Sequence, residues 1–168
     1  MRRDVRQMLF TGHYDHLIDE KNRLSIPSGL RNQMDPEADG KTLFLVPGPL
    51  PKSLWLYPKR QFYRISERLT DGLRRTDEQL EYEQALYGMA EELTMDASGR
   101  IVLPAQHLEL SGLGREITIC GVRDHLEIVD RQEFSQRKRE LWKNYAEIQR
   151  RARGALSDDL RQSGHPAG

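Results

Sequence analysis

Asp19-Glu20-Lys21-Asn22-Arg23-Leu24-Ser25-Ile26-Pro27 is matched 77 residues later by Asp96-Ala97-Ser98-Gly99-Arg100-Ile101-Val102-Leu103-Pro104. The two stretches share an Asp, an Arg, two apolar residues on either side of a third residue, and a Pro, all at the same spacing. Residues 54–62 also align with residues 126–134 at an offset of 72, so the first copy contains five extra residues before that point. We place these extra residues in the loop at 47–51. A repeat of this kind indicates that one structural unit is present twice.

The residue before each Arg predicts a tight turn. Asn22 and Gly99 belong to the residue types that adopt left-handed backbone conformations at least cost. The Arg then begins a short strand, and the Pro that follows suits the first turn of a helix because its missing N–H would have no partner there. We therefore predict strand, turn, short strand and short helix in each copy. The apolar residues of the short strands should be equivalent in pairs and buried: Leu24 with Ile101, and Ile26 with Leu103.

A wider set of residues carries a resemblance to a known family. The residues are Phe10, Gly12, Tyr14, His16, Leu17, Asp19, Lys21, Arg23, Leu24 and Pro27 in the first copy, and Asp96, Gly99, Arg100 and Pro104 in the second. At these positions the sequence resembles the MraZ family, whose chains are tandem pairs of SpoVT/AbrB-type modules, each marked by Asp-x-x-x-Arg. The resemblance covers residues 8–151. Two such motifs in register, with matching strands downstream, are far more specific than one.

The resemblance implies an α+β fold of two tandem, intertwined AbrB-like modules of the swapped-hairpin type, which form a pseudo-symmetric β-barrel-like core with outer helices. Two modules of about 45 to 50 residues would each bury too little surface alone, so we expect them to share one core. The expected segments are a first SpoVT/AbrB-type module at 10–61, linking helices at 62–89, a second module at 90–133, a C-terminal helix at 134–153 and a mobile tail at 154–168.

The same resemblance implies binding of double-stranded DNA at short direct repeats, and regulation of transcription of a bacterial division and cell-wall gene cluster. It further implies a closed homo-oligomeric ring that is cytoplasmic and associated with the nucleoid. No catalysis, cofactor or small-molecule substrate is implied. The alternative is an AbrB-fold protein-interaction module of the antitoxin type. Such antitoxins usually carry one copy and a disordered tail, so two copies and a long final helix argue against it.

The two turns contain the candidate site residues. By the resemblance, Asp19, Asn22, Asp96 and Gly99 organise the turns, while Lys21, Arg23 and Arg100 meet the DNA, where a guanidinium can contact a guanine edge or a phosphate. The alternative from the residues alone is that each Arg only pairs with its own Asp across the turn. Ser98 stands where Lys21 stands in the first copy, so we expect the first turn to dominate DNA binding.

Charge is balanced overall but segregated along the chain. Charged residues make up 31% of the sequence and the formal net charge is zero, so the bulk basic character typical of nucleic-acid binding is absent. Residues 77–96 contain seven acidic residues and no Lys or Arg, whereas residues 134–153 contain seven basic and two acidic residues. This distribution favours a dipolar surface with one side suited to a polyanion. The alternative is that both runs are ordinary solvated helix faces.

Other chemistry-bearing residues form no recognisable site. The spacing of His13, Asp15, His16 and Asp19 fits no standard metal-binding pattern, and strand alternation separates His16 from the first two. Cys120 is the single cysteine, as suits a reducing compartment. No apolar run is long enough for a signal segment or a membrane span, so we expect no membrane association.

Overall fold

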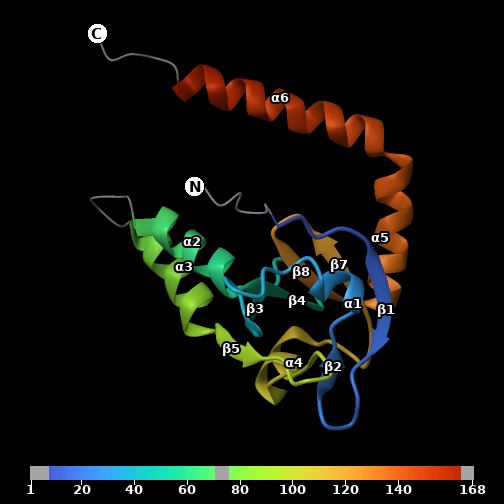
Figure 1. Cartoon of the computed structure of the whole chain (residues 1–168). Helices are drawn as coiled ribbons and strands as arrows, with labels where there is room; N and C mark the ends of the chain where they lie inside the picture. The colour runs from blue at the N-terminus through green and yellow to red at the C-terminus, as the bar shows by residue number, and fades with distance from the viewer. Residues whose placement is uncertain (1–7, 71–75, 164–168) are drawn as a thin grey trace. The chain divides into compact units, whose positions relative to one another are not determined.

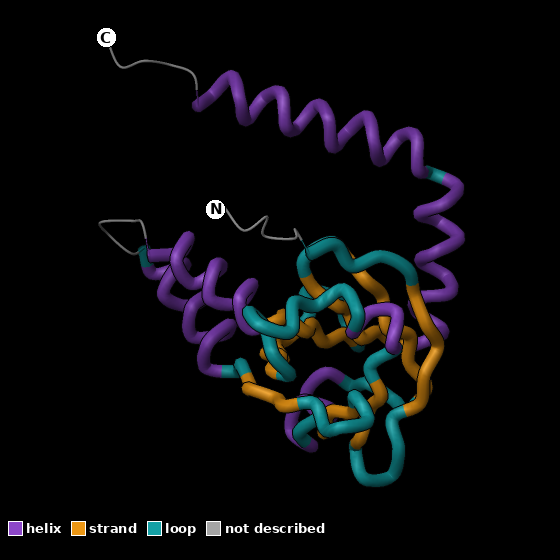
Figure 2. The backbone as a smooth tube through the Cα atoms, viewed as in Figure 1, coloured by secondary structure: helices purple, strands orange, loops and turns teal. Residues whose placement is uncertain are grey.

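The computed structural model describes residues 8–70 and 76–163 and divides into two compact units, one ending at Arg131 and one beginning at Gln132. The first unit is a mixed α+β structure built around a six-stranded antiparallel sheet (Figures 1 and 2). Its elements are β1 (His13–Leu17), β2 (Arg23–Ser25), α1 (Ser28–Arg31), β3 (Thr42–Pro47), β4 (Ser53–Pro58), α2 (Lys59–Thr70), α3 (Asp77–Gly88), β5 (Glu91–Thr94), β6 (Arg100–Val102), α4 (Ala105–Ser111), β7 (Glu116–Val122) and β8 (His125–Asp130).

The two copies of the repeat are intertwined in the sheet. The strand order is β1-β7-β8-β4-β3-β5. The counterparts in the two copies are β1 and β5, β3 and β7, and β4 and β8, and exchanging them gives the same order read backwards. The first strand of each copy therefore pairs with the third strand of the other, as β1 with β7 and β5 with β3. An approximate two-fold axis passes between β4 and β8, where Leu54 pairs with Ile128 and Leu56 with Leu126.

A two-stranded ribbon of β2 and β6 lies on the same axis. Leu24 pairs directly with Ile101, and both are fully buried. Ile26 and Leu103 are buried as well, so the predicted burial of these four residues is confirmed. The single main core contains residues of both copies, as expected for modules too small to fold apart.

A smaller apolar cluster covers the other face of part of the sheet. Because side chains alternate along a strand, Leu43 and Leu45 of β3 enter the main core while Phe44 and Val46 join this second cluster. Phe44 stacks on Phe62 of α2, with ring centroids 4.4 Å apart. The linking helices α2 and α3, which Figure 1 shows side by side, are thereby attached to the first copy.

The five extra residues of the first copy are divided between two places, and our placement of all five at 47–51 was wrong. The sheet register makes Leu43 equivalent to Ile117, an offset of 74, and Leu54 equivalent to Leu126, an offset of 72. Three extra residues therefore lie between Pro27 and β3, and two lie in the loop between β3 and β4. Apolar periodicity identifies strands but not the loop that absorbs an insertion.

The second unit is helical. Helix α5 (Arg131–Lys143) is separated from α6 (Tyr145–Ser163) by Asn144 alone. The expected end of the helix at Arg153 is not observed, because α6 continues for ten more residues; residues 164–168 of the expected tail lie outside the described part. Good helix formers such as Ala155 and Leu156 follow Gly154 and outweigh its low helix propensity. No helix in the described residues is both long and apolar enough to cross a bilayer.

The predicted α+β class is confirmed, but the barrel-like closure is not shown. Within residues 8–70 and 76–163, β1 and β5 are the edge strands of the sheet and no ladder joins them.

The shared core predicts a large effect of a single truncation on the two-fold axis. Ile101→Ala should lower the free energy of unfolding by about 2–5 kcal/mol, because it removes a fully buried side chain that contacts both copies. Val102→Ala is the matched control; Val102 is 57% exposed on the outer face of the same strand, and its truncation should change stability by no more than about 0.5 kcal/mol. Urea unfolding measures both, and equal midpoints for the two variants would contradict the shared core.

Candidate nucleic-acid interface

The first turn is organised by the carboxylate of Asp19. Its Oδ1 accepts hydrogen bonds from the backbone N–H groups of Lys21 at 2.9 Å and Arg23 at 2.8 Å, and its Oδ2 accepts from Arg23 Nε at 2.6 Å. The backbone N–H of Asn22 donates to the carbonyl of Asp19 at 3.0 Å. Asn22 has the left-handed conformation that this closure requires, with φ of 58°.

The second turn repeats the arrangement bond for bond. Asp96 Oδ1 accepts from the backbone N–H groups of Ser98 at 2.8 Å and Arg100 at 3.0 Å, and Oδ2 accepts from Arg100 Nε at 2.8 Å. Gly99 donates to the carbonyl of Asp96 at 3.0 Å and has φ of 74°. The hydrogen bonds to the charged carboxylate lower the pKa of each Asp, chiefly through the backbone N–H of its Arg, with a further contribution from that Arg's side chain.

The ion pair in each turn leaves most of the guanidinium available. An arginine has five N–H donors, and Asp19 and Asp96 each engage only the Nε donor of their Arg. No hydrogen bond recorded within the described residues uses the terminal Nη groups of Arg23 or Arg100, whose side chains are 36% and 39% exposed. The pairing with Asp therefore orients the side chain without consuming the edge that would contact a guanine or a phosphate.

The β2–β6 ribbon brings the two turns together. Arg23 pairs with Val102 and Arg100 with Ser25, so these four residues share the outer face while Leu24 and Ile101 face the core. The two arginines occupy diagonal positions, which in antiparallel strands are about 7–8 Å apart.

Each turn is also tied to the other copy. The N–H of Leu103 donates to the carbonyl of Asn22 at 2.8 Å, and the N–H of Ile26 donates to the carbonyl of Gly99 at 2.9 Å. The residue with the left-handed conformation in each turn is thus hydrogen-bonded to the residue that follows the short strand of the other copy. Lys21 lies on the exposed rim of the first turn.

Two arginines near the turns were not among the predicted site residues. Arg115, which directly precedes β7, donates through Nη1 to the backbone carbonyls of Ile18 and Asp19 at the first turn. Arg31 of α1 lies against Gly99 at the second turn. Both come from segments distant in sequence, so the motif spacing contains no signal for them.

The histidines and carboxylates near β1 do not converge. Asp15 accepts a hydrogen bond from Thr118 Oγ1 at 2.7 Å, and Asp19 is engaged in its turn. In the described part of the chain, no group of three or more His, Cys, Asp or Glu side chains is placed to hold a metal ion. Burial raises the pKa of Cys120 to about 11, so this thiol is protonated and poorly nucleophilic at neutral pH.

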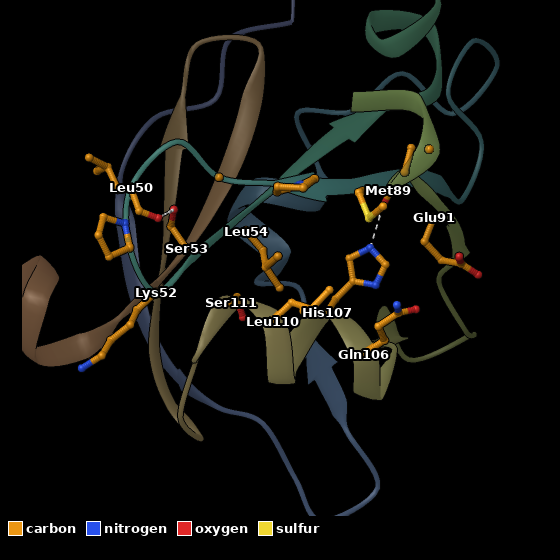
Figure 3. Close-up of a pocket in the computed structure, with 15 residues that line it drawn as sticks. Leu50, Lys52, Ser53, Leu54, Met89, Glu91, Gln106, His107, Leu110 and Ser111 are labelled. Atoms are coloured by element: carbon orange, nitrogen blue, oxygen red, sulfur yellow. Dashed lines mark hydrogen bonds between the residues drawn. The ribbon is translucent and has the colours of Figure 1, made fainter. Parts of the chain in front are cut away.

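A pocket of about 330 Å³ lies away from the turns, between the β3–β4 loop, the start of β5 and α4 (Figure 3). None of the predicted site residues lines it. The His107 ring contacts the Met89 carbonyl through Nε2 at 2.7 Å and thereby links α4 to the segment before β5.

Comparisons with known proteins agree with the division into two copies. The family described as "MraZ protein, putative antitoxin-like" matches residues 9–81 and 86–156, and each match contains one turn. The chain's relatives include proteins named "Transcriptional regulator MraZ". The protein from Dehalococcoides mccartyi is 30% identical over 131 residues, covering 78% of this chain and 89% of the relative. That from Nocardia farcinica is 30% identical over 148 residues (88% and 99%), and that from Mycobacterium tuberculosis 29% identical over 151 residues (90% and 96%).

The lowered pKa values predict how the turns respond to acid. Because the folded state favours the charged carboxylates, their contribution to stability is present above the ordinary Asp pKa and is lost as pH falls through the lowered values. The double variant Asp19→Asn/Asp96→Asn should therefore be less stable than wild type at neutral pH. The difference in the free energy of unfolding between wild type and the double variant should become smaller as pH falls below about 4. Urea unfolding at a series of pH values measures this difference, and Glu20→Gln in the same loop is the control. A difference in stability that does not depend on pH would refute this role of the carboxylates.

Proposed function

The chain belongs to the MraZ family, and on that premise we propose that it is a transcriptional regulator that binds double-stranded DNA through its two Asp-x-x-x-Arg turns. The observation that carries the proposal is the outer face of the β2–β6 ribbon, where Arg23 and Arg100 are held in matching orientations by their own aspartates. The family's model matches across both turns, and the relatives named as transcriptional regulators match most of the chain. Such a regulator works on DNA in the cytoplasm, at the nucleoid.

The geometry suits recognition in the major groove. The major groove of B-DNA admits a two-stranded β-ribbon, and an Arg can donate to both O6 and N7 of a guanine. Arg23 and Arg100 would contact base edges, Lys21 would contact phosphate, and Asp19, Asn22, Asp96 and Gly99 would hold the turns. The targets proposed, as the family resemblance implies, are short direct repeats upstream of a division and cell-wall gene cluster.

We further propose that the intertwined copies are AbrB-like modules of the swapped-hairpin type, at 10–61 and 90–133, forming a pseudo-symmetric barrel-like core. The pairing of β1 with β7 and of β5 with β3 supports this, because each copy's first strand is exchanged into the other copy. The competing function is an antitoxin-like protein-interaction module, which the family's description mentions. The presence of two matched turns favours DNA binding over that alternative.

Assembly into a closed homo-oligomeric ring is the next part of the proposal. Helix α3 has no buried residues and only acidic charged side chains, whereas α5 and α6 contain most of the basic residues beyond position 130. Exposed apolar side chains accompany both surfaces, including Tyr82 on α3 and Trp142 and Tyr145 on the basic helices. Complementary rather than identical surfaces favour head-to-tail contacts, which form a ring when the rotation closes.

Self-association is directly measurable. Light scattering at micromolar protein in moderate salt should give the mass of several subunits. Glu81→Lys on the acidic helix should lower that mass because it reverses one of the charges proposed to attract a neighbour. Glu20→Lys, outside that helix, is the control for a change of net charge. A wild-type chain that remains a monomer under these conditions would contradict the ring.

Arg23 and Arg150 should contribute differently to DNA binding. One good arginine contact to a base is worth about 1–3 kcal/mol, and in a ring the loss recurs at each bound subunit, so Arg23→Ala should reduce specific binding to background. Arg150→Ala in the basic helix should weaken binding slightly and lower the salt slope by about one unit if it removes one phosphate contact.

Salt titrations of wild type and both variants, on a repeat-bearing and on a scrambled duplex, make the comparison. Unfolding midpoints serve as the control for fold. If Arg23→Ala keeps its preference for the repeat-bearing duplex, the turn has only a structural role and the proposed DNA contact is wrong.

A further inference from the structure

We propose that Arg31 is a further DNA-contacting residue, which α1 of the first copy delivers to the turn of the second copy. The proposal rests on the proposed DNA-binding function of the turns. Arg31 belongs to neither Asp-x-x-x-Arg motif, and it acts across the copies: its own helix follows the first turn, but its guanidinium lies at the second.

The position of the guanidinium is defined by backbone groups. Arg31 Nε donates to the carbonyl of Ile26 at 2.9 Å, and the N–H of the same Ile26 donates to the carbonyl of Gly99 at 2.9 Å. One peptide segment therefore connects the arginine to the turn. A Cβ added at Gly99 would lie 2.5 Å from both Cζ and Nε of Arg31, so the guanidinium occupies the space that a side chain at 99 would need.

The first turn acts as an internal control for this interpretation. In the first turn Asn22 corresponds to Gly99, and Leu108 corresponds to Arg31. The members of each pair are 77 residues apart. Asn22 has almost the same left-handed conformation as Gly99, so the turn itself tolerates a side chain at this position. Leu108 packs against the main core, and Asn22 and Leu108 both line one surface pocket, so the space beside the Asn22 side chain is open. Glycine at 99 therefore serves the approach of Arg31 and not only the backbone conformation.

The consequence is a balance of charge between the turns. Residues 19–23 contain two acidic and two basic residues and residues 96–100 contain one of each, so both segments are formally neutral. Arg115 adds a cation at the first turn, where it donates to backbone carbonyls. Arg31 adds the corresponding cation at the second turn. Its Nε is engaged by Ile26, and no hydrogen bond or ion pair recorded in the described residues uses its Nη groups, so they are available to a phosphate beside Arg100. We therefore expect the two turns to contribute comparably, in place of the dominance of the first turn inferred from Ser98.

The test is a salt titration of DNA binding on the repeat-bearing duplex with the full chain. Arg31→Leu, which installs the residue found at the equivalent place in the other copy, should lower the slope of log K against log salt by about one unit for each bound subunit. At 0.1 M salt that is roughly a tenfold loss of affinity per contact. Arg31→Lys should retain most of the slope because the charge remains.

Gly99→Asn tests the route by which Arg31 is positioned. Asn is accepted by the backbone of the first turn, so this variant should fold, but its side chain displaces the guanidinium. Gly99→Asn should therefore lower the salt slope as much as Arg31→Leu does. The double variant Arg31→Leu/Gly99→Asn should lower the slope no further than either single variant. Gly40→Asn is the matched control and should leave the slope unchanged, because Gly40 is another left-handed glycine, lies outside both turns, and has no atom within 4 Å of an added Cβ. Unfolding midpoints confirm that each variant is folded.

The outcomes separate the proposals. An unchanged slope in Arg31→Leu, or an affinity loss that is equal at all salt concentrations, overturns the role of Arg31 as a phosphate contact while the function of the turns stands. Failure of the wild-type chain to bind any duplex overturns the proposed function itself.

Discussion

The antiparallel pairing of β2 with β6 is the interaction on which the rest of the structure depends. Each strand has three residues, and a two-stranded ribbon of that size is unstable in isolation. It forms because Leu24 and Ile101 meet on the two-fold axis and are buried in a core to which both copies contribute. The same pairing holds Asn22 and Gly99 against the strand ends of the opposite copy. The core and the candidate DNA-binding surface are therefore two faces of one ribbon.

This constraint reconciles the two interpretations of the Asp-x-x-x-Arg motif. A surface ion pair by itself contributes little to stability. In these turns, however, the carboxylate also accepts two backbone N–H groups, so it closes the turn and orients the arginine at the same time. A side chain that is already oriented loses less conformational freedom on binding. Pairing with Asp thus prepares the guanidinium for a contact and does not compete with that contact.

The sequence predicted the parts of the fold that depend on local patterns. The offset of 77 residues identified equivalent positions, and the alternation within the short strands identified Leu24, Ile26, Ile101 and Leu103 as core. It did not predict that β1 pairs with β7 and β5 with β3, because strand partners are chosen by the global topology. Arg31 and Arg115 were missed for the same reason, since each reaches its turn from the other copy. The length of α6 was missed because Gly154 and the polar residues beyond it resemble a tail, whereas the helix continues through them.

The departures from symmetry between the turns form a coupled set. Lys21 corresponds to Ser98, Asn22 to Gly99, and Leu108 to Arg31. The first leaves the formal charge of the two turn segments equal, because Glu20 offsets Lys21 and corresponds to the neutral Ala97. Glycine at 99 creates the space that Arg31 fills, and Arg31 adds a cation to the second turn. In the first turn Arg115 supplies the added cation, and the helix position is occupied by Leu108, which packs on the core. A duplicated unit can therefore keep equal charge at both turns while the residues that supply it differ, provided that the substitutions occur on both sides of the contact between the copies.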